Sequence, residues 1–345
     1  RQQAAEQGRW HAPRDGYELE VASIFEQVLG VGRVGVEDNF FELGGHSILA
    51  LRVMARVHKQ MGSELELSAL MREPTVGGLA RLIREQERGR GRVGRLVAIQ
   101  PAGGREPFYI VHPIGGQVMC YVGLARHLGP EQPVYGLEAG GLEAAAGLQE
   151  SIEGMAREYV EEVRKVHKGG AYVVGGWSMG GVIAYEMARQ MRREGDEVEA
   201  VVLIDTLSPA VMSKLGGYEE EDGFLMALYA RSQMRARGEA GAGVRPEQFK
   251  GMSEREQLEY LKREGVVPEE VSEEYAGRFM EGYRRRQRAI REYQGGGYEG
   301  RVVLVRGKRV EGEGDWLAEE YRRMGVDVGA RALGWDEEVS GDVEV

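Results

Sequence analysis

Gly176-Trp177-Ser178-Met179-Gly180 is the stretch that decides the fold of this chain, because of what stands on either side of it. Before it, Ala171-Tyr172-Val173-Val174 is a short apolar run of the kind that forms a buried strand. After it, apolar residues recur at the i, i+3, i+4 and i+7 spacing of a helix face, at Ala184, Met187, Ala188 and Met191. The sequence therefore predicts a strand, a tight turn with Ser178 at its tip, and a helix.

A strand, a Gly-x-Ser-x-Gly turn and a helix are typical of the nucleophile elbow of α/β-hydrolases. Gly176 and Gly180 are small enough for so tight a turn. The N-terminus of the following helix would face the place where an oxyanion forms. An ordinary glycine-rich turn is the alternative, but the flanking strand and helix favour Ser178 as a catalytic nucleophile.

The loop His112-Pro113-Ile114-Gly115-Gly116, which follows an apolar run at 108–111, predicts a second part of the same site. In α/β-hydrolases, a loop after an early strand and the residue after the nucleophile supply the two backbone donors of the oxyanion hole. We expect these donors to be the N–H groups of Ile114, with Gly115 as the near alternative, and of Met179. A simple tight turn is the other interpretation of a loop in so glycine-rich a chain.

Asp205 ends the next apolar run, Ala200-Val201-Val202-Leu203-Ile204, and follows Ser178 by 27 residues. That spacing accommodates one helix and one strand, so both residues should emerge at the same edge of a parallel sheet. A catalytic triad needs an acid at this place to orient a histidine and stabilise its cation. Asp205 is the candidate acid; an aspartate that only caps the next segment is the alternative.

The remaining segments complete an α/β-hydrolase domain at 95–345. Strands are predicted at 96–99, 301–305 and 341–345. The long, charged and helix-leaning segment 209–294 interrupts the pattern, as a lid inserted into a hydrolase would. Four arginines in it could meet a phosphate, but we expect them on a solvated helix face: Arg284, Arg285, Arg286 and Arg288.

A length of 345 residues suggests about two domains. Hydrophobic residues make up 42% of the chain and charged residues 29%, as is usual for a globular protein. A net charge of −11 argues against nucleic-acid binding. No apolar run approaches the ~20 residues of a membrane span, and no signal peptide opens the chain. The one cysteine, Cys120, excludes an internal disulfide and is predicted to be a small buried hydrophobe. We therefore expect a cytoplasmic protein that binds no membrane and no metal.

A small helical bundle of the four-helix type is predicted at 16–84. One helix has an apolar face over 21–29, a second starts near Ser47 and ends near Met61, and a third begins after Pro74 with Thr75 as its N-cap. Such a bundle has a thin core. We therefore expect this bundle to carry an attached chemical group on its surface and not to enclose a substrate.

The stretch Asp38-Asn39-Phe40-Phe41-Glu42-Leu43-Gly44-Gly45-His46-Ser47 resembles the phosphopantetheine attachment motif of peptidyl carrier proteins in nonribosomal peptide synthetases. The resemblance implies that a phosphopantetheinyl transferase attaches 4′-phosphopantetheine covalently to Ser47. A serine at a helix start also suits a phosphate, because free N–H groups and the helix dipole meet there. An ordinary N-cap serine is the alternative. His46, in place of an acidic residue, is more similar to peptidyl carriers than to polyketide or fatty-acid carriers.

Two segments are predicted to connect these domains to each other and to their surroundings. Residues 1–15 are polar and aperiodic, as in a linker or the tail of an upstream domain. Residues 85–94 are charged and glycine-rich, which predicts a flexible linker.

The general base is missing from the pattern. The order in α/β-hydrolases is serine, acid, histidine, and none of the six histidines follows Asp205. Either the enzyme is degenerate or the sequence is cut short. We expect truncation at both ends, since the chain starts at Arg1 and the hydrolase pattern is incomplete at its C-terminus, and we expect the histidine beyond Val345.

The resemblance to a peptidyl carrier followed by a releasing thioesterase implies one chemistry for the whole chain. Upstream condensation and adenylation modules deliver a peptidyl thioester at Ser47, the peptide passes to Ser178, and water or a nucleophile of the peptide releases it as an acid or a macrocycle. Two alternatives stay open: an editing thioesterase or lipase-like esterase, and a non-catalytic carrier and docking module.

Overall fold

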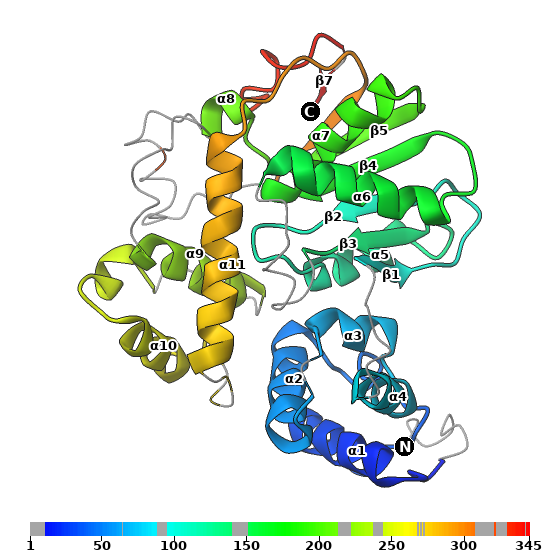
Figure 1. Ribbon diagram of the computed structural model, residues 1–345, viewed down its shortest axis with the longest axis vertical. Coiled ribbons are helices and arrows are strands. Elements are labelled where there is room, and N and C mark those ends of the chain that lie inside the picture. The colour runs from blue at the N-terminus through cyan, green and yellow to red at the C-terminus, as the bar shows by residue number, and fades with distance from the viewer. Residues whose placement is uncertain are drawn as a thin grey trace, which may run out of the picture. The chain divides into compact units, whose positions relative to one another are not determined.

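The computed structural model describes residues 11–63, 65–87, 95–139, 151–212, 222–236, 244–267, 269, 271, 273–307, 321, 330–341 and 343–345. The chain divides into two compact units, with the main boundary between Gly94 and Arg95 (Figure 1).

The N-terminal unit is a bundle of four helices, as the sequence predicted. They are α1 (Gly16–Leu29), α2 (Ser47–Met61), α3 (Leu67–Arg72) and α4 (Val76–Glu87). Side chains with no exposed surface form its core, among them Val21, Ile24, Phe25, Phe40, Val53, Leu70, Leu79 and Ile83. The capping signal at Thr75 is confirmed, because its hydroxyl accepts a hydrogen bond from the Gly78 N–H at 3.1 Å.

Both ends of this unit differ from the predicted linkers. The Val36 N–H donates to the His11 carbonyl at 3.0 Å, and Arg14 bonds to Glu18, so residues 11–15 are part of the bundle. At the other end, α4 continues through Glu87, into the segment 85–94. Residues 1–10 and 88–94 lie outside the described residues.

The second unit is built on a seven-stranded sheet in the order β1-β3-β2-β4-β5-β6-β7. Its strands are β1 (Leu96–Gln100), β2 (Phe108–Val111), β3 (Val134–Leu137), β4 (Tyr172–Trp177), β5 (Val198–Ile204), β6 (Val302–Val305) and β7 (Val343–Glu344). Only the pairing of β1 with β3 is antiparallel among these seven. The central strands are rich in valine and isoleucine because helices cover both faces of the sheet. The predicted α/β-hydrolase sheet is thereby confirmed.

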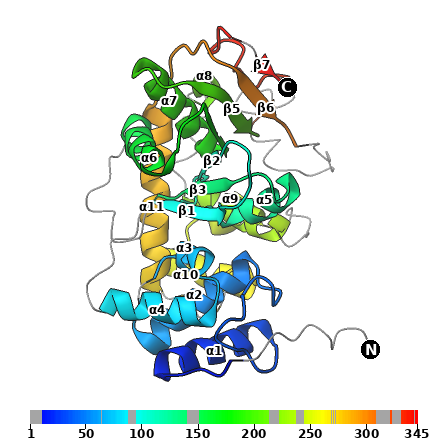
Figure 2. The same cartoon turned by 90° about the vertical axis from the view of Figure 1, so that its right-hand side faces the viewer.

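Helices lie on both sides of this sheet. On one side, α6 (Ile152–Val166) packs against α7 (Met179–Arg193), and α7 packs on β4 and β5. On the other side lies α5 (Val122–Leu128), which the short 3-10 helix η1 (Met119–Tyr121) precedes (Figure 2). Cys120 is exposed, contrary to the sequence-based expectation, because in this short helix its two neighbours are the residues that turn inward.

A helical insertion separates β5 from β6, as predicted for 209–294. Its described elements are α8 (Pro209–Met212), α9 (Asp222–Ala236), η4 (Pro246–Phe249), α10 (Glu254–Arg263) and α11 (Glu273–Glu292). The longest of these, α11, is the orange helix in Figure 1. Beyond it the chain returns to the sheet at β6.

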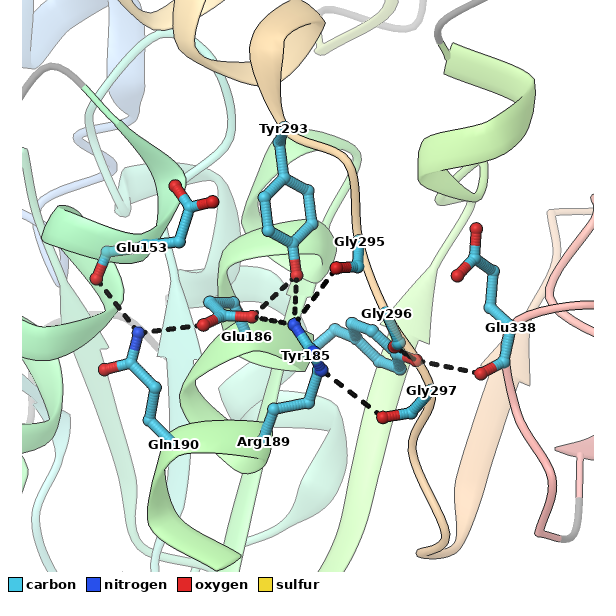
Figure 3. Close-up of polar contacts among 10 residues, drawn as sticks. All are labelled: Glu153, Tyr185, Glu186, Arg189, Gln190, Tyr293, Gly295, Gly296, Gly297 and Glu338. Atoms are coloured by element: carbon cyan, nitrogen blue, oxygen red, sulfur yellow. Dashed lines mark hydrogen bonds and ion pairs between the residues drawn. The ribbon is translucent and has the colours of Figure 1, made fainter. Parts of the chain in front are cut away.

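A buried polar network joins the end of this insertion to α7 (Figure 3). The Glu186 carboxylate accepts hydrogen bonds from the Tyr293 hydroxyl at 2.7 Å and the Gln190 amide at 2.9 Å, and it pairs with Arg189. Arg189 also donates to the Gly295 carbonyl at 3.3 Å. A buried carboxylate is costly unless it is hydrogen-bonded or paired, and both oxygens of Glu186 have a partner. The network therefore fixes the exit of α11 to the helix that follows Ser178.

Candidate functional site

Ser178 lies between β4 and α7 with backbone angles of φ 54° and ψ −123°. A positive φ is rare for any residue with a side chain and indicates local strain. Two hydrogen bonds hold this geometry: the Ser178 N–H donates to the Ile204 carbonyl, and its carbonyl accepts from the Gly181 N–H, both at 3.0 Å. The turn is therefore imposed by the strand beside it and by the start of the helix.

The glycines around Ser178 are required by close approach of the backbone. A Cβ on Gly176 would lie less than 3.0 Å from Gly180, and a Cβ on Gly180 less than 3.0 Å from the Val111 carbonyl oxygen. Real Cβ atoms essentially never approach so closely. Gly181, which the motif does not include, is crowded in the same way by the Thr206 side chain.

Asp205 follows β5 as Ser178 follows β4. Trp177 and Ile204 are paired in the parallel register of these strands, so the next residues, Ser178 and Asp205, occupy equivalent positions at neighbouring strand ends. The Asp205 carboxylate accepts a hydrogen bond from the Gly307 N–H at 3.0 Å. The sheet thus brings the predicted nucleophile and acid to one edge and orients the acid from the strand on its other side.

The predicted oxyanion loop begins where β2 ends. It is closed by a turn in which the Gly116 N–H donates to the Pro113 carbonyl at 2.8 Å. The Ile114 carbonyl accepts from the Arg286 Nε at 2.6 Å. Within the described part of the chain, the N–H groups of Ile114 and Met179 have no protein acceptor. Both remain available to an oxygen atom of a ligand.

Tyr121 is a site residue that the sequence analysis missed. Its buried hydroxyl donates to the Val111 carbonyl at 2.7 Å and accepts from the Trp177 N–H at 2.9 Å. It thereby connects the last residue of β2 to the residue before Ser178. Nothing local in the sequence signals this role, because the two partners are 10 and 56 residues away.

His112 is the first residue of the predicted oxyanion loop, but its contacts make it structural. Its Nδ1–H donates to the Pro113 carbonyl, and its Nε2 accepts from the Tyr159 hydroxyl, both at 2.7 Å. Full burial lowers the pKa of His112 to about 3, so the ring stays neutral. A ring with both nitrogens occupied and no exposed surface has no lone pair for Ser178.

The other two histidines of the hydrolase unit, His127 and His167, are also engaged in contacts that do not involve Ser178. His127 bonds to the Gly123 carbonyl at 2.7 Å within α5. His167 contacts the Tyr109 hydroxyl and the Gly170 carbonyl, each at 3.2 Å, just before β4 begins. The remaining three belong to the helical bundle: His11, His46 and His58. None of these contacts supplies a base to the predicted nucleophile.

Ser47 is the first residue of α2, and the N-cap is His46, whose side chain makes no capping bond. The interpretation of Ser47 as an ordinary N-cap is therefore wrong. With no cap from the His46 side chain, the amino end of this 15-residue helix offers backbone N–H groups to an anion, which fits a phosphodiester on Ser47.

The loop that leads to Ser47 is anchored by Phe40. This ring is fully buried, packs edge-on against Phe25 at 5.3 Å, and its N–H donates to the Pro74 carbonyl at 2.8 Å. A Cβ on Gly45 would lie less than 3.0 Å from the Phe40 ring. Gly45 is thus required for packing inside the bundle.

Neither a membrane segment nor a metal centre is found in the described residues. No helix there has the length and apolarity to cross a bilayer. Nor do histidine, cysteine, aspartate and glutamate side chains gather there in groups of three or more that could hold a metal ion.

Comparison with known proteins agrees with both units. A model of the phosphopantetheine attachment site matches residues 20–83, and a model of the thioesterase domain matches residues 106–316. A dimodular nonribosomal peptide synthase of Bacillus subtilis (strain 168) is 33% identical over 262 residues, which are 76% of this chain and 10% of that protein. Malpinin synthetase of Mortierella alpina is 37% identical over 198 residues, 57% of this chain and 3% of that protein.

Among solved structures, a holo four-domain nonribosomal peptide synthetase bound to AMP and glycine matches with a TM-score of 0.62 and 29% identity. The match covers 98% of this chain and 25% of that one. The chain therefore spans a quarter or less of these three relatives. On these matches, the chain belongs to the thioesterase domain family and carries a phosphopantetheine attachment domain ahead of its α/β-hydrolase fold, a pair homologous to that of nonribosomal peptide synthetases.

Proposed function

We propose that this chain works as the carrier and releasing thioesterase of a nonribosomal peptide synthetase, with Ser178 as nucleophile and Asp205 as triad acid. The observation that carries the proposal is the register of β4 and β5, which sets the strained Ser178 and Asp205 at neighbouring strand ends. Strain at a nucleophile is a feature of pre-organised active sites. The domains we assign are a carrier at 16–84 and a thioesterase at 95–345.

The proposed reaction has two acyl-transfer steps. First, the Ser178 oxygen attacks the carbonyl carbon of a peptidyl thioester; a C–O bond forms, the C–S bond breaks, and the thiol leaves with the proton taken from the serine. Backbone N–H groups of Met179 and of Ile114 or Gly115 hold the charge on the carbonyl oxygen. Then water or a nucleophile of the peptide attacks the ester, and Ser178 regains its proton. Water yields an acid, and an internal nucleophile yields a macrocycle.

Ser47 is the proposed attachment point for 4′-phosphopantetheine. The uncapped start of α2 supports this assignment, because its N–H groups suit the phosphodiester. When bound, the group supplies a thiol that carries the peptide. The partners implied are a phosphopantetheinyl transferase and upstream condensation and adenylation modules. A single cysteine, and hence no internal disulfide, agrees with a cytoplasmic synthetase.

We further propose that the general base is a histidine that is not among the six of this sequence. His112 is buried with both ring nitrogens bonded, and His127 and His167 bond elsewhere in the hydrolase unit. The 345-residue chain by itself should therefore acylate slowly, and a small base supplied in solution should accelerate it.

A fluorophosphonate probe tests the nucleophile and the missing base together. The chain is incubated with the probe, with and without imidazole, and labelling is followed by intact mass and peptide mapping. We expect slow labelling of Ser178, faster labelling with imidazole, and none in Ser178→Ala. Labelling that survives Ser178→Ala, or no labelling even with imidazole, would overturn the nucleophile and leave a non-catalytic docking module. Fast labelling without imidazole would overturn the missing-base proposal.

The carrier assignment has its own test. The chain is incubated with a phosphopantetheinyl transferase and coenzyme A, and the modified peptide is mapped. One modification at Ser47, absent from Ser47→Ala, is expected. Modification at another residue would contradict the assignment.

A further inference from the structure

Arg286 differs from the arginines beside it on α11. Arg284 pairs with Glu254 at 2.7 Å and Arg285 pairs with Glu281 at 2.8 Å, while Arg288 is exposed. Arg286 instead turns toward the sheet, and its Nε donates to the Ile114 carbonyl at 2.6 Å. Among the described residues this is its only hydrogen bond, and no carboxylate pairs with it. The expectation that all four arginines lie on a solvated face is therefore wrong for Arg286.

Two glycines make room for the Arg286 guanidinium. A Cβ on Gly116, in the oxyanion loop, would lie 3.1 Å from the guanidinium carbon. A Cβ on Gly282, one turn earlier on α11, would lie 3.1 Å from Nη1. Glycine inside a helix costs about 1 kcal/mol of helix stability relative to alanine. The space that Gly282 leaves for the Arg286 guanidinium is a packing reason for a glycine at this position. The guanidinium is thus fitted between the helix and the loop.

The charge of Arg286 persists in this position. Burial lowers its pKa to about 10, and the hydroxyls of Tyr159 and Tyr283 act in the opposite direction. The side chain is therefore a cation at neutral pH. A charged donor makes a stronger hydrogen bond to a carbonyl than a neutral one.

We propose that Arg286 is a positioning residue that couples the helical insertion to the oxyanion loop. A peptide unit is planar, so a bond to the Ile114 carbonyl also fixes the Gly115 N–H and the backbone between the two candidate donors. With α11 in place the loop is ordered, and when α11 moves away the loop loses this restraint. The structural coupling does not depend on the proposed function; only the claim that this loop holds an oxyanion rests on it.

Hydrogen exchange measured by mass spectrometry tests the coupling without any need for activity. In Arg286→Met, amides of peptides covering residues 113–117 should exchange at least about fivefold faster, since about fivefold is the factor for the loss of an uncharged hydrogen bond and the Arg286 donor is charged. Arg288→Met is the matched control, because it removes the same charge from an exposed position of the same helix. Equal loop exchange in Arg286→Met and wild type would overturn the proposal.

A pair of glycine variants covers the case in which Arg286→Met fails to fold. Gly282→Ala crowds the guanidinium, whereas Gly277→Ala, on the same helix, meets no atom within 4 Å. Both should favour the helix equally. Faster loop exchange in Gly282→Ala alone supports the coupling, and the same exchange in both variants would overturn it.

Fluorophosphonate labelling with imidazole then links the loop to the chemistry. Arg286→Met should lower the maximal labelling rate at Ser178 and leave the half-saturating probe concentration unchanged, with Arg288→Met like wild type. If wild type is not labelled at all, the proposed function fails, while the exchange data still decide whether Arg286 restrains the loop. A labelling rate in Arg286→Met equal to that of wild type would contradict the claim that restraint of the loop by Arg286 speeds the reaction at Ser178.

Discussion

At the scale of single residues, the turn around Ser178 depends on glycines at positions where no side chain would fit. The positive φ of Ser178 costs about 1–3 kcal/mol, which the surrounding contacts must offset. The positions of Ser178 and Asp205 at neighbouring strand ends were predictable because their signals are local: a five-residue motif and the end of an apolar run. The bonds of Tyr121 to Trp177 and of Arg286 to Ile114 were not predictable, because these partners are 56 and 172 residues apart in the sequence and only the fold brings them together.

Gly180→Ala should disable the proposed nucleophile, Ser178, without unfolding the unit. The new Cβ would overlap the Val111 carbonyl oxygen, so α7 or β2 has to shift. We expect Ser178 labelling to fall by about 10²-fold, the scale for a displacement of ~1 Å, and stability to fall by about 1–3 kcal/mol. Labelling kinetics and urea unfolding measure both. Gly123→Ala is the control, since its Cβ meets nothing within 4 Å; equal labelling in the two variants would contradict the crowding argument.

Glu18 should make the helical bundle sensitive to acid. Its buried carboxylate accepts hydrogen bonds from the Arg14 backbone N–H and guanidinium, both at 2.7 Å, and these bonds lower its pKa. A pKa lowered by folding adds stability above the unfolded value of 4.5, and this stability is lost as pH falls below it.

The measurement for Glu18 is the melting temperature of the bundle at neutral pH and at about pH 3.5, below the unfolded pKa. Wild type should lose more stability on acidification than Glu18→Gln, which cannot titrate. Parallel losses in the two proteins would show that Glu18 does not carry the effect.

At the scale of elements, periodic patterns predicted the helices better than the sheet. The spacing of apolar residues gave both ends of α2 and the C-terminal end of α1, because contacts within a helix are local, but α1 begins five residues before the predicted apolar face. The order of the strands was not predicted: β3 lies between β1 and β2, which are successive in the chain. Strand neighbours depend on long-range pairing that no local pattern encodes.

Tyr293→Phe should loosen the joint between the helical insertion and α7. The substitution removes one donor from the buried Glu186 carboxylate and leaves the rest of the ring in place. We expect a loss of about 1–3 kcal/mol in the free energy of unfolding, measured by urea denaturation. Tyr260→Phe on α10 serves as control, since its hydroxyl has no hydrogen bond among the described residues. An equal loss of unfolding free energy in Tyr260→Phe would contradict a specific contribution of the Tyr293–Glu186 bond to stability.

At the scale of the whole molecule, each of the two compact units has an apolar core of its own among the described residues. The helical bundle has its own fully buried aromatic cluster around Phe40 and Phe25, and the sheet has a separate apolar core with α6 and α7. The length of the chain predicted about two domains. The change from helical to strand-forming patterns near Arg95 lies at the main boundary between the two units.

Phe40→Ala should therefore unfold one unit and spare the other. Loss of a buried phenylalanine costs about 3–5 kcal/mol, which is most of the stability of so small a bundle. Calorimetry should show one transition moved to lower temperature and one unmoved, with Ser178 labelling unchanged. Ala184→Gly, in the core of α7, is the reciprocal control and should shift the other transition. A single transition that moves as a whole would contradict separate cores.

The contact between Gly181 and Thr206 has a consequence for engineering. It seats the first turn of α7 directly on the segment that leads from β5 into the insertion. A foreign insertion should therefore be spliced in after Thr206 and before Tyr293, whose hydroxyl donates to the Glu186 carboxylate on α7. Such an insertion would have to keep an arginine at the place of Arg286, which bonds to the Ile114 carbonyl. Gly176, Gly180 and Gly181 would have to stay glycine, because a Cβ at any of the three would lie less than 3.0 Å from a neighbouring atom.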